Sequence, residues 1–132
     1  MTVFVCVDDN MGMMFNNRRQ SRDSGLINKM IEMTNGKKLW MNSYSAKLIK
    51  NHYIYVEEDF LDKADTEDYC FVENNKLTDH EKKIEKLIVF KWNKVYPSDK
   101  KLDISTEKMT LIQQFDFKGT SHKKISCEVW SK

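Results

Sequence analysis

Short runs of β-branched and aromatic residues alternate along the chain with segments in which apolar residues recur every three or four positions. The first run, residues 3–7 (Val-Phe-Val-Cys-Val), contains no charged position, and such a run is typical of a strand buried on both faces. Similar runs predict further strands, because these side chains favour the pleated backbone. The further predicted strands are residues 38–42, 52–56, 69–72, 87–90, 102–105, 109–117 and 125–130.

The clearest predicted helix begins near Gly25, and its apolar residues follow the i, i+3, i+4 rule that gives one apolar face. Asp23 and Ser24 precede it as capping residues, and Asn35-Gly36 ends it. The other predicted helical segments are residues 43–50 (capped by Ser43 or Ser45), a helix that Thr78 caps with Glu81 in a capping-box pattern, and a short piece before Pro97.

The order of these elements predicts the fold class. Residues 13–22 are polar and cationic without a clear period, so we expect a long loop there. Strands separated by helices indicate a mainly parallel sheet flanked by helices, and the last two strands form an antiparallel hairpin around residues 118–121. A length of 132 residues fits one α/β domain over residues 1–132.

Composition narrows the class of protein. Lys and Arg total 22 against 20 Asp and Glu, and this balance gives no strong preference for nucleic acid or an acidic membrane. No apolar stretch approaches transmembrane length, and the first run is too short for a signal peptide. Cys6, Cys70 and Cys127 lie in apolar or β-like runs without a CxxC pair, so we predict buried free thiols and a cytoplasmic protein.

Several strings, taken in order, resemble the dihydrofolate reductase family. Residues 3–13 are similar to the family's first strand and its Asn-x-Gly-Ile-Gly loop, and residues 34–42 (Thr-Asn-Gly-Lys-Lys-Leu-Trp-Met-Asn) resemble Thr-x-Gly-Lys-x-Val-x-Met-Gly. Residues 43–45 stand where the family has Arg/Lys-x-Thr. Residues 87–96 resemble the strand and helix around the family's double glycine, and residues 115–129 its closing hairpin. The resemblance implies a shortened, divergent dihydrofolate-reductase-like fold over nearly the whole chain.

The resemblance also implies a substrate site around Asp23, which matches the family's pterin-binding acid. A carboxylate there could accept paired hydrogen bonds from the 2-amino group and a ring nitrogen, and could take part in catalysis. The alternative is that Asp23 only caps the helix. Val5, Met13 and Ile27 are the implied apolar contacts of the substrate, with ordinary core packing as the alternative.

The cofactor side departs from the family pattern. The double glycine lets the backbone approach a pyrophosphate, whereas here residues 91–93 read Lys-Trp-Asn, and Trp92 would fill that space. Asn42 replaces a glycine, Ser43 a basic residue, and Glu57 stands where a serine often holds the 2′-phosphate. We therefore predict no cofactor, with NADPH as the alternative. The remaining candidate cofactor contacts are Ser43, Ser45, Lys47 and Trp92.

A separate basic cluster consists of Arg18, Arg19 and Arg22. It could contact the phosphates of a nucleotide or RNA, and a solvated loop is the alternative. Residues 8–23 also resemble a group of small uncharacterised bacterial proteins sometimes labelled ribonuclease, although the chain has no HxHxDH metal motif. Three histidines lack the spacing of metal ligands and are predicted as surface or capping residues: His52, His80 and His122.

Two classes of function remain open from the sequence. The first is a divergent member that has lost NADPH-dependent reduction and uses the fold to bind a pterin-like or nucleotide-like small molecule or a partner. The second is an NADPH-dependent reductase of a pterin-like substrate with Asp23 as its acid. Binding of RNA or a nucleotide by the arginine cluster is a further alternative. Fold does not decide between them, and the changes on the cofactor side favour the first.

Overall fold

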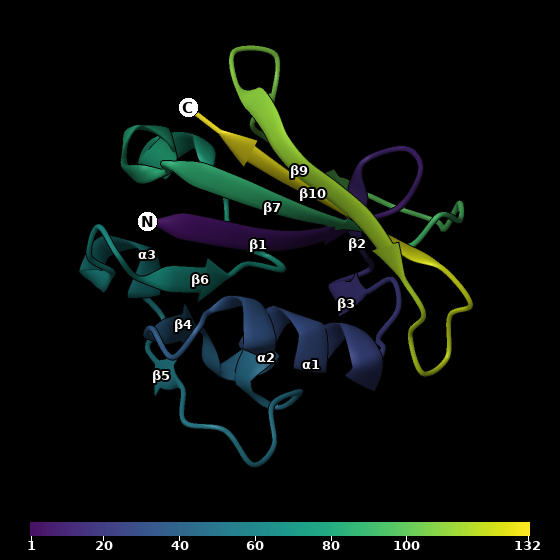
Figure 1. Cartoon of the computed structure of the whole chain (residues 1–132), viewed down its shortest axis with the longest axis horizontal. Helices are drawn as coiled ribbons and strands as arrows, with labels where there is room; N and C mark the ends of the chain where they lie inside the picture. The colour runs from purple at the N-terminus through teal and green to yellow at the C-terminus, as the bar shows by residue number, and fades with distance from the viewer.

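The computed structural model describes all residues from Met1 to Lys132. Figure 1 shows a long twisted sheet with β1 near its middle. The strands from β5 to β7 run parallel, and β10 and β9 complete the sheet as antiparallel strands. The sheet has seven strands in the order β5 (Tyr55–Val56), β4 (Leu39–Met41), β6 (Tyr69–Phe71), β1 (Thr2–Val7), β7 (Lys86–Lys91), β10 (Ile125–Ser131) and β9 (Thr110–Phe117).

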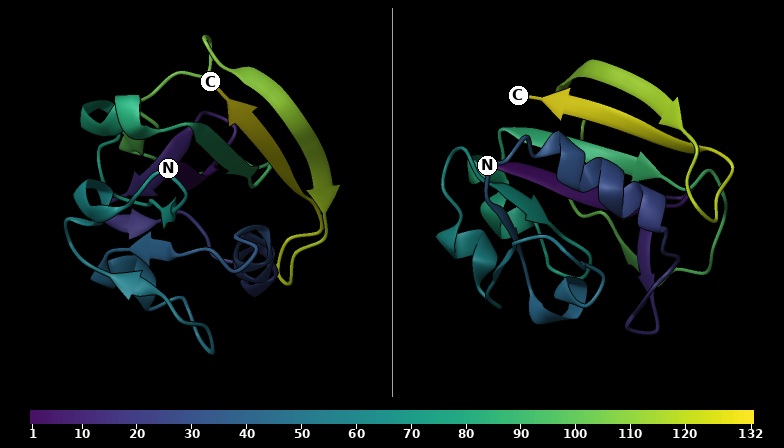
Figure 2. Two further views of the ribbon diagram at one scale, coloured as in Figure 1. Left: turned by 60° about the vertical axis from the view of Figure 1, so that its left-hand side comes forward. Right: turned by 60° about the horizontal axis from the view of Figure 1, so that its bottom comes forward.

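Smaller elements surround this sheet. A second, antiparallel sheet has the strand order β3 (Arg18–Arg19), β2 (Gly12–Phe15) and β8 (Lys100–Lys101). One long helix, α1, lies along a face of the main sheet, as Figure 2 shows. The helical segments are α1 (Ser24–Met33), α2 (Ser43–Ala46), α3 (Phe60–Lys63) and the 3₁₀ helix η1 (Thr78–Lys83). No helix is long and apolar enough to cross a membrane.

Strand β1 explains why the core has two layers, because successive side chains of a strand point to opposite faces of the sheet. Phe4 belongs to the cluster that includes Leu26 and Met30 of α1, and its ring stacks on Phe90. Val5 and its odd-numbered neighbours belong to the cluster on the other face, with α3 and β2. The sheet is therefore covered on both faces around β1, as the continuous apolar run predicts.

The longest predicted elements are confirmed. Strands β1, β4, β6, β7, β9 and β10 match the predicted runs to within one or two residues. Helix α1 begins after its N-cap Asp23 and stops before Asn35 and Gly36, which have φ of 50° and 79°. All three cysteines are free thiols, and burial raises the pKa of Cys70 and of Cys127 to about 12.

The predicted loop over residues 13–22 is wrong, because part of it forms the β2–β3 hairpin. Phe15 pairs with Arg18, so Asn16 and Asn17 are the two turn residues, with φ of 52° and 61°. A two-residue turn with both φ values positive matches the right-handed twist of the flanking strands, and Asn tolerates that conformation. The Asn-Asn pair was the available signal.

The shorter elements also need correction. The helix predicted over residues 43–50 is limited to α2, and its N-cap is Asn42, whose side chain accepts from the Ser45 N–H. The segment from Thr78 is the 3₁₀ helix η1, and the carboxylate of Asp103 accepts from the Leu77 and Thr78 N–H groups in place of a capping box. The strand predicted at residues 52–56 shortens to β5, the one at 102–105 is replaced by β8, and no helix precedes Pro97.

Candidate functional site

A narrow cavity, called the inner slot below, lies where α1 begins, beside the carboxyl ends of β1 and β6. Its cavity volume, counted as the space open to the centre of a water-sized sphere, is about 20 Å³, which is room for about one water molecule. Residues from six parts of the chain fill the surrounding space: Cys6, Met13, Arg19, Gln20, Ser21, Arg22, Asp23, Leu26, Ile27, Leu48, Phe71, Val72, Glu73 and Trp92.

The carboxylate of Asp23 joins the start of α1 to the β9–β10 loop. Its Oδ1 accepts from the N–H groups of Leu26 (3.1 Å) and Thr120 (2.8 Å). Its Oδ2 accepts from the N–H groups of Ser121 (2.8 Å) and His122 (3.1 Å) and from the Ser121 hydroxyl (3.1 Å). Burial alone would raise the pKa of Asp23, but these hydrogen bonds outweigh it and hold the pKa well below its usual range.

Two glycines allow this close packing. A Cβ at Gly119 would collide with the Asp23 carboxylate, and one at Gly25 would lie 3.0 Å from both Asp23 Oδ1 and the Thr120 nitrogen. Neither glycine has a positive φ, so each is needed for space rather than for backbone conformation. The β9–β10 loop therefore approaches α1 as closely as a main chain can.

His122 is buried at the centre of this contact, with 7% of its surface exposed, so its prediction as a surface or capping residue is wrong. Its Nδ1 lies 3.0 Å from Asp23 Oδ2, and its Nε2 lies 3.1 Å from Ser21 Oγ and 3.4 Å from the Tyr96 hydroxyl. Its ring packs on Trp92 with centroids 4.6 Å apart. The sequence offered little signal for this residue, because its partners are remote in the chain.

A second buried acid, Glu73, holds Arg19 across the slot. Arg19 Nε and Nη2 donate to the two oxygens of Glu73 at 2.8 and 3.0 Å, and the buried Ser45 hydroxyl donates to the same carboxylate at 2.7 Å. The Arg19 guanidinium also lies 4.3 Å from the centre of the Tyr44 ring. The bond to Glu73 raises the pKa of Arg19. These contacts keep Arg19 from serving as a free anion-binding group.

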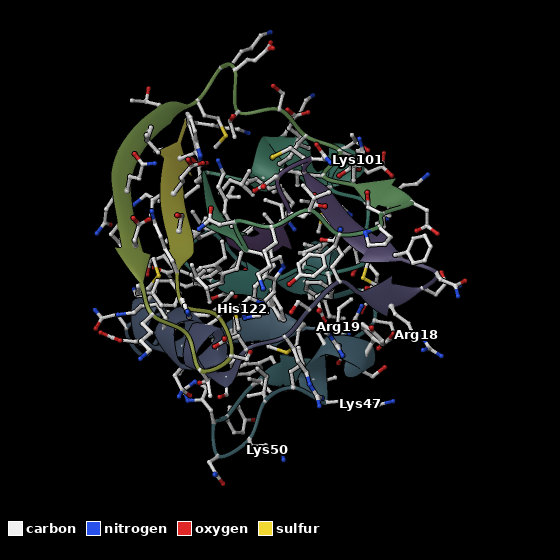
Figure 3. The ribbon with its side chains drawn as sticks, turned by 90° about the vertical axis from the view of Figure 1, so that its right-hand side faces the viewer. Arg18, Arg19, Lys47, Lys50, Lys101 and His122 are labelled. Carbon is white, nitrogen blue, oxygen red and sulfur yellow. The ribbon has the colours of Figure 1, made fainter.

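An open outer groove adjoins the inner slot, and the two share Arg22, Asp23, Ile27 and Leu48. Its volume is about 550 Å³. Arg22, Lys47 and Lys50 line it, and none of them forms a salt bridge within the protein. Figure 3 shows Lys47 and Lys50 on the same side of the molecule as Arg18, below His122.

Comparison with known proteins bears on the fold. No protein-family model matches the sequence, and no curated protein matches it significantly. In structure the chain is similar to a dihydrofolate reductase from Enterococcus faecalis complexed with NADP(H) and RAB-propyl. The TM-score is 0.70 over 98% of this chain and 94% of that chain, at 8% identity. The chain has the dihydrofolate reductase fold.

Within this dihydrofolate reductase fold, three of the four predicted substrate contacts lie at the slot, and the fourth does not. Asp23 and Ile27 line both the slot and the groove, and Met13 lines the slot. Val5 lines neither and is fully buried in the core. Asp23 is the N-cap of α1, which was the alternative to a substrate-binding role. In addition, its carboxylate accepts hydrogen bonds from the β9–β10 loop.

The predicted cofactor contacts are already engaged by the protein. The Ser43 N–H donates to the Glu58 carboxylate at 2.9 Å, and Ser45 is fully buried against Glu73. Trp92 is buried against His122, and no helix follows it, contrary to the resemblance-based prediction. Lys47 alone of this set lines the open groove.

The arginine cluster is divided by the fold. Arg18 is exposed on β3, Arg19 is held by Glu73, and Arg22 lines the groove. No group of three or more His, Cys, Asp or Glu side chains is placed to hold a metal ion. The cations that remain without a salt bridge around the groove are therefore Arg22, Lys47 and Lys50.

Proposed function

We propose that this chain binds a phosphorylated small molecule of the nucleotide class in the outer groove and does not reduce a pterin with NADPH. The observation that carries the proposal is the pairing of a closed inner slot with an adjoining groove of about 550 Å³ lined by three cations without carboxylate partners.

The slot argues against pterin binding. A bicyclic ring needs far more than the 20 Å³ present beside Asp23. Asp23 also offers its two oxygens to five donors of the chain besides the His122 ring. A pterin would have to displace the β9–β10 loop, and the buried N–H and ring of His122 would then lose their acceptor, at a cost of about 1–3 kcal/mol for each buried donor.

The cofactor side argues against NADPH, because its residues do not fit a pyrophosphate. The Ser43 N–H at the start of α2 already donates a hydrogen bond to the Glu58 carboxylate, so it is not free for a phosphate. Glu57 is paired with Lys63 and would repel a 2′-phosphate.

The outer groove fits a nucleotide in size and in chemistry. Ligand pockets for small molecules are commonly about 300–1,000 Å³. Arg22, Lys47 and Lys50 supply charge-assisted donors for phosphate oxygens, and Ile27 and Leu48 supply an apolar wall for a ring. The structurally similar reductase is complexed with a dinucleotide, NADP(H), which agrees with this ligand class.

Calorimetric and thermal-shift titrations test the proposal. We expect AMP, ATP or pyrophosphate to raise the melting temperature by mass action, and methotrexate to cause no further rise, whether alone or together with NADPH. The double variant Lys47→Ala/Lys50→Ala should weaken binding by about 30-fold, since each phosphate contact contributes on the order of 1 kcal/mol and about 1.4 kcal/mol is tenfold. The control is Lys82→Ala/Lys108→Ala, whose lysines lie around a different pocket.

An additional stabilisation by methotrexate, beyond that of NADPH alone, would contradict the proposal and favour the reductase. Tight binding of single-stranded RNA, with a steep salt dependence that Arg18→Ala reduces, would instead favour a nucleic-acid surface. A ligand that binds equally well to both lysine double variants would place the site elsewhere.

A further inference from the structure

Three side chains at the inner slot are connected in the order acid, histidine, serine. Asp23 Oδ2 lies 3.0 Å from His122 Nδ1, and His122 Nε2 lies 3.1 Å from Ser21 Oγ. Ser21 is half-buried and lines the slot together with the buried Asp23, and His122 is buried between them. A nucleophile bonded to a base, which is in turn oriented by an acid, is the arrangement of a covalent hydrolase.

We propose that Ser21 is a nucleophile activated by His122, with Asp23 as the positioning residue, and that the site hydrolyses esters of small acyl groups. The anionic character of the alcohol part rests on the proposed function of the outer groove, because Arg22 lines both spaces. The substrate class is therefore a formyl or acetyl ester of a phosphate-bearing alcohol.

The hydrogen bonds around His122 fix the required tautomer. Asp23 is an ionised acceptor, so the proton of the neutral imidazole lies on Nδ1 and the lone pair on Nε2. The Ser121 hydroxyl is 3.2 Å from the same Nδ1, but it also lies 3.1 Å from Asp23 Oδ2 and can donate to it. The free lone pair of Nε2 can then accept the proton of Ser21. The Tyr96 hydroxyl, at 3.4 Å from Nε2, is the only competing donor.

The proposal assigns the oxyanion to two unpaired backbone N–H groups at the nucleophile. The backbone N–H groups of Ser21 and Arg22 have no acceptor within the protein, and a nucleophile's own N–H group commonly stabilises the negative oxygen of the intermediate. The side chain of Arg22 adds a cation beside them. The space of about 20 Å³ at Ser21 limits the acyl group to the smallest members of the class.

The reaction balances with water as the only co-reactant. Ser21 Oγ attacks the ester carbonyl carbon while its proton passes to His122 Nε2. The tetrahedral intermediate then breaks the bond to the alcohol oxygen, which takes the proton from His122 and leaves. Water attacks the acyl-serine with the same base, and the carboxylic acid and the serine hydroxyl are released.

Methanesulfonyl fluoride, a small serine reagent, tests the nucleophile directly. Ser21 should form an oxygen–sulfur bond as fluoride leaves, giving a single adduct that peptide mapping by mass spectrometry places on Ser21. Ser21→Ala should give no adduct. His122→Gln should slow labelling by about 100-fold or more, which is the usual contribution of a general base. The full-length protein should also hydrolyse p-nitrophenyl acetate with a burst, and p-nitrophenyl butyrate much more slowly.

Matched variants separate this proposal from a purely structural network. Ser126→Ala removes a hydroxyl that is bonded to Asp116 on the hairpin strands, and it should label at the wild-type rate. Tyr96→Phe removes the competing donor and should keep or raise the labelling rate. For Asp23, ¹⁵N spectra of the His122 ring should show a protonated Nδ1 in the wild type and a changed tautomer population in Asp23→Asn, whether or not that variant is less stable.

The proposal is overturned if folded protein gives no adduct, if another serine is labelled, or if His122→Gln labels at the wild-type rate. It is also overturned if Tyr96→Phe loses labelling as fully as Ser21→Ala does. Nucleotide titration and labelling of the wild-type protein keep the two proposals apart. Nucleotide binding without any adduct removes the hydrolase alone. Labelling of Ser21 without nucleotide binding removes the groove, and with it the phosphate on the alcohol part of the substrate, but keeps the nucleophile.

Discussion

The middle of the sheet and the polar layer at the carboxyl ends of its strands are both buried, and they are held together in different ways. In the middle, β1 lies between β6 and β7, and Phe4 stacks on Tyr69 and Phe90 without any side-chain hydrogen bond. The polar layer consists of three buried acids, Asp8, Asp23 and Glu73, and the groups that donate hydrogen bonds to them.

Each acid of the polar layer holds a neighbouring segment of the chain: Asp8 and Asp23 hold loops, and Glu73 holds strand β3. Asp8 accepts from the N–H groups of Gly12 and Tyr96, Asp23 from the β9–β10 loop, and Glu73 from Arg19. Apolar packing is non-directional and adapts to several arrangements, whereas a carboxylate with several donors fixes one loop geometry. The sheet therefore supplies most of the stability, and the polar layer determines the shape of the site.

The largest effect is expected in the middle of the sheet. Phe4→Ala should lower the free energy of unfolding by about 4 kcal/mol, because a fully buried aromatic ring is lost and a cavity remains. Urea denaturation measures this loss, and Tyr53→Ala is the control, since Tyr53 is 76% exposed. A loss below about 1 kcal/mol would mean that the core around β1 is loosely packed.

Asp23→Ala should come next, with a loss of about 3 kcal/mol, because the buried N–H groups of Leu26 and His122 and the buried His122 ring lose their acceptor. Hydrogen exchange at Thr120 and His122 should accelerate far more than exchange in β1, so that the two regions separate experimentally. Asp59→Ala is the matched control, because Asp59 precedes α3 without making a side-chain cap bond. Equal acceleration in both regions would refute the distinction.

Acid titration sharpens the same comparison. The pKa of Asp23 is lowered in the folded state, so its contribution is fully present above the unfolded value of about 3.9 and is lost as the pH falls below it. The stability difference between wild type and Asp23→Asn should therefore narrow below about pH 4. The cost of Phe4→Ala should not narrow in this window. A gap that widens on acidification would contradict the lowered pKa.

A smaller effect is expected for the Arg19–Glu73 pair. A double-mutant cycle with Arg19→Met and Glu73→Gln should give a coupling energy of about 1–2 kcal/mol, because the pair is bidentate and mostly buried. The exposed pair of Lys37 and Glu67 should couple by less than about 0.5 kcal/mol. Similar coupling in the two pairs would show that burial adds little here.

The smallest effect concerns the β2–β3 turn. Asn17→Gly should raise the free energy of unfolding by about 0.5 kcal/mol, because Asn17 has a positive φ that glycine adopts without strain. Thermal denaturation measures the gain. Asn28→Gly, in the middle of α1, should lower the stability by a comparable amount or more.

The sequence predicted the sheet better than the site because the two depend on different ranges of interaction. Composition alone indicates the buried strands at residues 3–7, 87–90 and 125–130. The spacing of apolar residues that predicts α1 is visible within ten residues. Asp23 was recognised through its place at a helix start and through a family resemblance. The predictions of the short elements were wrong where groups distant in sequence determine the local structure. One example is Asp103, which accepts hydrogen bonds at the start of η1.

The partners of Asp23 could not be found in the same way. Its partner His122 has no local pattern, and neither do Ser21 and Glu73, which line the same slot. The three come together only when α1, β6 and the β9–β10 loop have docked on the sheet. Gly119 was an available hint, since a lone glycine in a hairpin loop can mark a close approach of the main chain. The pattern of apolar positions shows which face of an element is buried, but not which buried acid meets which loop.

The separation in sequence between Asp23 and its hairpin donors has a consequence during synthesis. Thr120, Ser121 and His122 follow Asp23 by 97 to 99 residues. At about 5–20 residues per second, the ribosome extends the chain for roughly 5–20 s after Asp23 is made before those donors exist. The helix cap can form early, whereas the acid–histidine pair and the shape of the slot arise only when the hairpin has emerged. A nascent chain therefore exposes an incomplete sheet edge at β7 and lacks the Asp23–His122 pair until translation of the hairpin is finished.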